Sequence, residues 1–376
     1  MSQYKLITNG QRRSFKMKDH AIRYSSFVPR LYNLAKSLGF TKGKIMPSRA
    51  FCSDESQGFP VILIAKHFAA FPFNHGRVGG MIALDRHGPH AHHGLDMVII
   101  HASHVGYDKE THEYGVYKRL QTERACYTTN CGKIGGVIAW YLQQYEYAKT
   151  HIFISKQAYN YSIIIDNELL TERENGLVLE LENFIEADDA GNFQVLENLS
   201  TAKRFALLSQ RRVAVEKLNI KEGDIIPIGD LLTSADFFFN KQTTDHMELN
   251  LLSAMPVIVS SSAPMLKAAQ VSTQVEFDRG FRSISQNSHY EGKNVLFISG
   301  LNVDISPESG QVFPLTKFVP WAAYHQTAEG QQTVWEQKEV LQRLHDQPDD
   351  NEDKIELDSA ISDMESYKEI LLEEPE

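Results

Sequence analysis

The hydrophobic positions along the chain predict one dominant strand in its first third. Residues 97–100 form an apolar run that follows a glycine and an aspartate, as a buried strand often does. His104 comes just past this run and is followed by Val-Gly. Because side chains at strand ends in α/β sheets commonly carry chemistry, His104 is a candidate functional residue.

Other segments predict further helices and strands. Apolar side chains recur at helical spacing from Phe27 to Leu38 and stop at Gly39, which predicts an amphipathic helix. Residues 59–65 are continuously apolar, and their periodicity does not decide between a strand and a short helix. We interpret three more segments as helices, at 137–142, 196–218 and 355–372, and four as strands, at 152–154, 161–165, 255–259 and 294–300.

Composition places the chain among ordinary globular proteins, with 376 residues, 42% hydrophobic and 23% charged. The net charge of −10 is unevenly spread. Residues 336–376 hold 15 acidic and 4 basic side chains, a net charge of −11, so the remainder carries +1. A nearly neutral body gives no indication of a nucleic-acid surface. The acidic tail is expected to be dispensable, with a disordered link at 348–353 and a soluble, metal-holding chain after truncation near Val334.

Several observations favour a cytoplasmic protein. No apolar run approaches the roughly 20 residues that a membrane helix needs. The first five residues lack the apolar core of a signal peptide. Only three cysteines occur, at positions 52, 126 and 131, and an odd, small number is a poor disulfide framework.

Cys52, His104 and Cys131 together offer the chemistry of a metal site. Cys131 stands before a glycine-rich helix start, where the helix dipole favours a thiolate. Two thiolates and one imidazole suit Zn²⁺ and leave a fourth position open, which is the pattern of catalytic zinc. Water in that position can become a hydroxide nucleophile near neutral pH. The alternative is that the cysteines are small buried hydrophobic side chains.

Two more residues could serve such a site. Asp54 lies two positions after Cys52, close enough to orient water or to ligate the metal itself. Arg77, in a loop with three glycines, can form a bidentate pair with a carboxylate. Cys126 lacks the glycine-rich helix start and is expected to pack as a small side chain.

A histidine-dense loop is the second candidate for metal binding. His87, His90, His92 and His93 lie in it with irregular spacing, beside Gly88 and Pro89. The bland alternative is a solvated loop or a surface that relays protons.

Four short motifs in fixed order resemble the limiting-CO2-inducible B/C family, the theta-class carbonic anhydrases. They are Cys52-Ser-Asp54-Glu55, Phe71-Pro-Phe-x-x-Gly76-Arg77-Val-Gly79, Ala102-Ser-His104-Val-Gly106 and Asn130-Cys131-Gly132. The resemblance covers roughly residues 25–230. It implies zinc ligands at Cys52, His104 and Cys131, an Asp54–Arg77 dyad, a homodimer, and an α/β fold with a central sheet flanked by helices, resembling beta-class carbonic anhydrase.

The resemblance also implies an activity and a division of the chain. We expect a zinc-dependent carbonic anhydrase, a lyase that interconverts CO2 and bicarbonate through a zinc-bound hydroxide, with His75, His101 or His92 passing the proton to solvent. The expected parts are a zinc-binding domain over 1–235, a strand-rich extension or second small domain over 236–335, and the acidic tail.

Other functions stay open at this point. A zinc hydrolase of small esters or amides would need a general base and an oxyanion donor that the sequence does not reveal. A non-catalytic zinc scaffold or bicarbonate-responsive binding protein would hold metal without a CO2-hydration rate. A redox switch between Cys126 and Cys131 is the fourth hypothesis.

Overall fold

The chain is described from a computed structural model. The description covers residues 15–83, 95–119, 126–158, 160–166, 177–179, 185–187, 190, 193–195, 204–206, 209–234, 237–239, 243–308, 311 and 314–366. Two compact units are present, one formed by Met1–Gly132 with Ala269–Glu376, the other by Lys133–Ala268.

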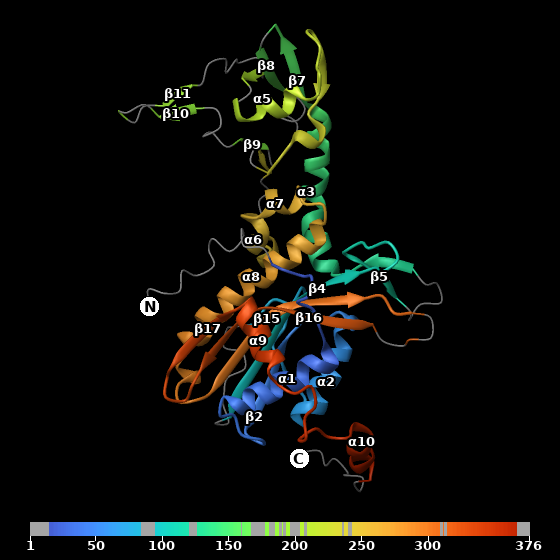
Figure 1. The fold of residues 1–376 in the computed structure, drawn as a ribbon, viewed down its shortest axis with the longest axis vertical. Coiled ribbons are helices and arrows are strands. Elements are labelled where there is room, and N and C mark those ends of the chain that lie inside the picture. Colours follow the sequence, from blue (N-terminus) through green and yellow to red (C-terminus); the bar gives the residue numbers. More distant parts are fainter. Residues whose placement is uncertain are drawn as a thin grey trace, which may run out of the picture. The chain divides into compact units, whose positions relative to one another are not determined.

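The first unit is built on a seven-stranded mixed sheet (Figure 1). Its order is β1-β16-β15-β4-β2-β3, and β17 pairs with β16 off this path. The neighbours β15, β4, β2 and β3 are parallel, whereas β1, β16 and β17 join antiparallel. The strands are β1 (Ile22–Arg23), β2 (Ile45–Ala50), β3 (Phe73–Asn74), β4 (Asp96–Tyr107), β15 (Val295–Ile305), β16 (Leu315–Gln326) and β17 (Gln332–Glu336).

Helices α1 (Tyr24–Ser37), α2 (Gly58–Phe68) and α9 (Gln337–His345) share one hydrophobic core with this sheet. The apolar stripe of α1 lies in that core, as the helical spacing predicts. Phe27 stacks on Phe318 of β16 with ring centroids 4.1 Å apart. Val98, Ile100 and Ala102 are the residues of β4 that face these helices. Alternate residues of β4 therefore point to the core on this face.

The other face of the sheet carries α8 (Pro264–Ser285). Phe277 of this helix stacks on Phe297 of β15, with ring centroids 5.4 Å apart. Gly280 allows the close approach, since a Cβ there would lie 2.6 Å from the Phe297 ring. The central sheet is thus flanked by helices on both faces, and the expected α/β class is confirmed.

The remaining elements of the first unit are short. They are η2 (Glu55–Gln57), β5 (Val116–Arg119), β6 (Cys126–Thr129), η5 (Ser288–Tyr290) and α10 (Leu357–Glu365). No helix of the described residues is long and apolar enough to cross a membrane.

The second unit contains a four-stranded antiparallel sheet in the order β12-β8-β7-β13. Two further pairs, β10-β11 and β14-β9, are also antiparallel. The strands are β7 (Ile152–Gln157), β8 (Asn160–Ile165), β9 (Leu177–Leu179), β10 (Ile185–Ala187), β11 (Phe193–Val195), β12 (Arg204–Ala206), β13 (Ile225–Pro227) and β14 (Phe237–Phe239). The helices are α3 (Gly132–His151), α5 (Ser209–Glu216), η4 (Gly229–Leu231), α6 (His246–Leu252) and α7 (Met255–Val259).

The strand expected at 255–259 is wrong, because this segment is the helix α7. Met255, Ile258 and Val259 are its buried residues, and the intervening spacing is helical. The helix expected over 196–218 is also wrong in part. Its described portion holds β12, which pairs with β8, before α5 begins at Ser209. The undecided run at 59–65 lies within α2.

The expected boundaries at 235 and 335 differ from the compact units. Strand β15 lies between β4 and β16 in the middle of the first sheet, so residues far apart in sequence close one core. Residues 295–326 are therefore not an extension of the sheet but part of its centre. In sequence, the second unit is an insertion, Lys133–Ala268, between the two segments that form the first unit.

The expectation of a disordered link at 348–353 is wrong. Asn351 is buried, and its Nδ2 donates to the carbonyl of His67 at 2.7 Å, near the end of α2. Asp353 accepts from Lys36 at 2.8 Å, Lys42 at 3.0 Å and the Tyr32 hydroxyl at 3.0 Å. These contacts hold the pKa of the Asp353 carboxyl well below its usual range. The acidity of this segment serves pairing with cations of α1 and the loop after it.

Truncation after Val334 should therefore unfold the first unit rather than spare it. The cut removes Trp335, Val340 and Leu344, which are 2%, 0% and 0% exposed. Burial of each such side chain contributes about 1.5–3 kcal/mol, and the sum approaches the whole stability of an ordinary domain. Thermal unfolding and soluble yield measure the effect. A matched truncation after Glu356 keeps β17, α9 and Asp353 and should unfold cooperatively near the full-length midpoint. A chain ending at Val334 that is soluble and unfolds cooperatively would contradict the assignment of residues 335–344 to the core of the first unit.

Candidate metal centre

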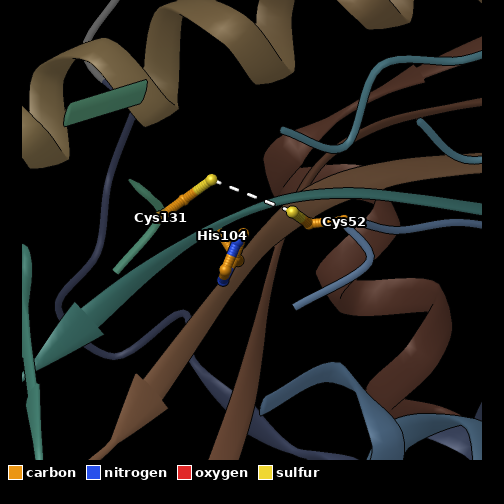
Figure 2. Close-up of side chains that lie close together, drawn as sticks. All are labelled: Cys52, His104 and Cys131. Atoms are coloured by element: carbon orange, nitrogen blue, oxygen red, sulfur yellow. Dashed lines mark hydrogen bonds between the residues drawn. The ribbon is translucent and has the colours of Figure 1, made fainter. Parts of the chain in front are cut away.

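Three side chains meet at one end of the parallel strands (Figure 2). One ligand atom each from Cys52, His104 and Cys131 lies within 4.8 Å of the others. The two sulfur atoms are 3.9 Å apart. All three residues are buried, at 4%, 0% and 1% exposure. The structure thus brings together the three residues that the sequence nominates as ligands.

The parallel pairing of β2 and β4 explains how Cys52 and His104 meet. Ala50, the last residue of β2, is in register with His101 of β4, and the two strands are parallel. Their carboxyl ends therefore lie at the same end of the sheet. Cys52 comes two residues after the end of β2, and His104 lies three residues further along β4. This edge is where parallel sheets commonly place their sites.

Cys131 is brought in by a backbone contact with β4. The Gly106 amide donates to the Asn130 carbonyl at 3.1 Å, and the Asn130 amide donates to the Gly115 carbonyl at 3.0 Å. A Cβ on Gly106 would lie 2.4 Å from the carbonyl oxygen of Val116. Only glycine at position 106 lets the segment that carries Asn130 pack against β4. Cys131 is the residue directly after Asn130.

His104 is oriented by Asp304 of β15. Its Nδ1 lies 2.9 Å from Asp304 Oδ2. A carboxylate accepts only, so Nδ1 carries the proton and donates. His104 Nε2 is buried and has no hydrogen-bond partner among the described residues. This nitrogen is left as the ligand atom, in the carboxylate–histidine arrangement typical of metal sites.

Asp304 itself is fully buried and saturated with donors. Ser56 Oγ donates to it at 2.9 Å, Gln57 Nε2 at 2.8 Å and Thr316 Oγ1 at 3.1 Å. Four donors, His104 included, stabilise a charge that would otherwise be costly to bury. The carboxylate is thereby fixed in place.

A second layer of polar residues holds these donors. Asn302 Nδ2 donates to Gln57 Oε1 at 2.6 Å, and the Tyr24 hydroxyl donates to Asn302 Oδ1 at 2.8 Å. Burial first, and then Asp304, raise the pKa of Tyr24 well above its usual range, so it stays a donor. Sequence reasoning missed Asp304 and Asn302. The available signal was a pair of polar residues two apart within an apolar run, which places both on one face of the strand.

The two thiols differ in their proton affinity. Hydrogen bonding with Cys131 lowers the pKa of Cys52 to about 4, against the effect of burial and with help from His104 and the Gly79 amide. The Gly79 amide donates to Cys52 Sγ at 3.1 Å. The same sulfur contact and burial raise the pKa of Cys131 to about 12. Without metal, the pair is one thiolate and one thiol at neutral pH.

Burial opposes a charge on His104, but Asp304 and the two sulfurs outweigh it and raise the pKa of His104 well above its ordinary value. In the absence of metal, Cys131 and His104 therefore carry protons that a bound cation would displace. Two sulfurs, an unpartnered buried nitrogen and a fixed carboxylate behind it fit Zn²⁺.

Asp54 lies beside the three ligands but outside their cluster. It is the N-cap of η2, and its Oδ1 accepts from the Ser56 amide at 3.1 Å. Asn130, the residue before Cys131, approaches the same oxygen with Nδ2 at 3.5 Å. Arg77 is exposed, and its carbonyl accepts from the Gly80 amide at 2.9 Å in a turn whose Gly79 and Gly80 are buried. The ion pair of Asp54 with Arg77 stays a prediction.

The expected proton carriers do not suit that role where they are described. Burial, and then Arg49, lower the pKa of His75 to about 3. Burial also lowers the pKa of His101 to about 3, and both of its ring nitrogens are hydrogen bonded. Neither ring gains a proton near neutral pH. His92, the other histidines of its loop and the side chain of Cys126 lie outside the described part of the chain.

Solved structures resemble the chain at low identity. One is PtLCIB4, a homologue of the limiting CO2-inducible protein LCIB, with a TM-score of 0.49 and 12% identity over 84% of this chain and 95% of that one. Another is LCIB itself, with a TM-score of 0.44 and 12% identity over 84% and 94%. No family model matches the sequence, and neither does any curated protein.

Asp304→Asn should weaken metal binding without unfolding the chain. The amide cannot accept from all four donors as the carboxylate does, so His104 loses its fixed tautomer and orientation. Loss of such a partner typically costs about 10- to 100-fold in metal affinity. Competition with a chelator measures the affinity, and Thr316→Val is the matched control, expected to cost less. An unchanged affinity in Asp304→Asn would contradict the role of this carboxylate.

Metal binding should release about two protons per chain near pH 7, one from Cys131 and one from His104. Both groups have raised pKa values and are protonated in the metal-free chain at this pH. The apparent association constant should then rise about 100-fold for each unit increase in pH. Calorimetry of Zn²⁺ binding in two buffers of different ionisation enthalpy counts the protons. Cys126→Ser should release the same number, and zero release would contradict the ligand set.

Proposed function

We propose that this chain is a zinc-dependent carbonic anhydrase that interconverts CO2 and bicarbonate. The observation that carries the proposal is a buried cluster of three ligands, Cys52, His104 and Cys131, found among the residues that the structure describes. Structural zinc sites usually have four protein ligands, whereas catalytic sites keep one position for water or substrate. The order of the motifs around these residues, which resembles the LCIB family, supports the same activity.

The ligands of the chain set the charge and geometry of the centre. Two thiolates balance the two positive charges of zinc, and Asp304 holds the His104 ring with Nε2 toward the sulfurs. When bound, zinc supplies a Lewis acid that brings the pKa of a water near neutrality. The Gly79 amide stabilises negative charge on the Cys52 sulfur.

Asp54 and Arg77 act as orienting groups in this proposal. The η2 turn fixes Asp54 through its contact with the Ser56 amide, close to the residue that precedes Cys131. A carboxylate in this position can accept a hydrogen bond from the O–H of a water or hydroxide and align a lone pair of that oxygen toward CO2. Arg77 is assigned to hold Asp54 away from the metal by a bidentate pair.

Asp54→Asn and Arg77→Ala should keep their metal but lose CO2 hydration. Orientation and electrostatics contribute about 10²–10⁴-fold in rate, whereas neither residue belongs to the ligand cluster. Zinc content and stopped-flow hydration rate are measured on the same preparations. Arg77→Lys and Glu55→Gln are matched controls, the first keeping the charge and the second removing an adjacent carboxylate.

Zinc content and rate together distinguish three outcomes. Retained zinc with a lost rate in both variants supports the dyad, and an unchanged rate in Arg77→Ala removes this residue from the mechanism. A wild-type chain that holds zinc but hydrates CO2 no faster than buffer would instead favour the non-catalytic scaffold.

A further inference from the structure

The histidine of β4 that the mechanism does not use, His101, is fully buried between two fixed partners. Its Nε2 lies 2.9 Å from the carbonyl oxygen of Gly80, and its Nδ1 lies 2.7 Å from Ser299 Oγ. A carbonyl accepts only, so Nε2 carries the proton and the Ser299 hydroxyl donates to Nδ1. Both ring nitrogens are thus committed, and the ring is a neutral, fixed donor.

The carbonyl that His101 holds belongs to a turn that touches the metal centre. Gly79 and Gly80 have φ of 86° and 79°, a conformation that other residues rarely adopt. The Gly79 amide donates to Cys52 Sγ at 3.1 Å. A Cβ on Gly80 would lie 2.6 Å from the carbonyl oxygen of Ala102, so the turn rests directly on β4. Held on one side by His101, the turn presents its amide to the sulfur on the other.

Further contacts fix the segment around this turn. The Arg77 amide donates to the Met81 carbonyl at 2.8 Å, and the Gly80 amide returns to the Arg77 carbonyl at 2.9 Å. The Ile82 amide donates to the buried carboxylate of Glu276 in α8 at 2.7 Å. The backbone around Arg77 is therefore fixed on β4 through the contact of Gly80 and on α8 through the hydrogen bond of Ile82.

We propose that His101, braced by Ser299, is a positioning residue of the metal centre: it fixes the Gly79–Gly80 turn so that the Gly79 amide hydrogen bonds the Cys52 sulfur. An N–H donor draws charge from a thiolate and so tunes the metal that the thiolate binds. The proposal deepens the proposed function and rests on it for its effect on the metal. The geometry of the turn itself does not depend on metal.

Two measurements on full-length protein test the proposal. The first is hydrogen exchange of the peptide spanning residues 76–83 in the metal-free chain. His101→Leu removes the donor to Gly80, and exchange at Gly79 and Gly80 should accelerate about tenfold or more because their hydrogen bonds open. His101→Gln can still donate at the Nε2 position and should restore protection, and Ser299→Ala should give a smaller increase.

The second measurement uses Co²⁺ alone as the probe. The sulfur-to-cobalt charge-transfer band should move to longer wavelength in His101→Leu and return toward the wild-type position in His101→Gln. His67→Leu is the matched control, since His67 is also buried, at 6% exposure, but lies in the last turn of α2. This control should leave both the exchange of 76–83 and the band unchanged.

The two readouts distinguish the two proposals. Unchanged exchange at Gly79 and Gly80 in His101→Leu overturns the positioning role, whatever the metal does. A wild-type chain that takes up no Co²⁺ overturns the proposed metal centre, while exchange still decides the role of His101. If His101→Leu does not fold, Ser299→Ala and His101→Gln decide it: protection lost in the first and kept in the second supports the proposal, and any other pair of results contradicts it.

Discussion

The hydrogen bond between His104 and Asp304 joins parts of the chain that are 200 residues apart. It forms because β4 and β15 are parallel neighbours, with Asn302 in register with His104 and Asp304 in register with Gly106. A buried carboxylate is tolerable only with donors around it, and the chain supplies them from η2, from β16 and from His104 itself. The centre therefore depends on the closure of the whole central sheet.

Strand β4 serves the centre from both of its faces. Its alternation places His104 toward α1, α2 and α9, and His101 toward α8. One histidine offers a ligand atom, and the other holds the turn that donates to Cys52. Polar groups in an otherwise apolar sheet are costly to bury unless they are paired. Both ring nitrogens of His101 and the Nδ1 of His104 are paired, and His104 Nε2 is left for a metal ion.

The local features of the centre could be predicted from sequence, whereas its long-range supports could not. The apolar run of β4, the helix at Phe27 and the nomination of Cys52, His104 and Cys131 follow from short patterns. Asp304 could not be predicted as the partner of His104, because no spacing rule connects a residue to its partner across a parallel sheet. Residues 255–259 misled because a short apolar run fits a strand and a buried helix equally well. The prediction for the acidic segment failed because composition does not reveal its cationic partners, Lys36 of α1 and Lys42 of the loop after it.

The ligand set is tested most directly by X-ray absorption at the zinc edge of the loaded full-length protein. The account predicts two sulfur ligands at about 2.3 Å with the remaining nitrogen or oxygen ligands at about 2.0–2.2 Å. Cys52→Ser should reduce the sulfur contribution by one, and Cys126→Ser should leave it unchanged. A first shell of nitrogen and oxygen alone would place the metal elsewhere, with the histidine-dense loop as the first alternative, and would contradict the Cys52–His104–Cys131 centre.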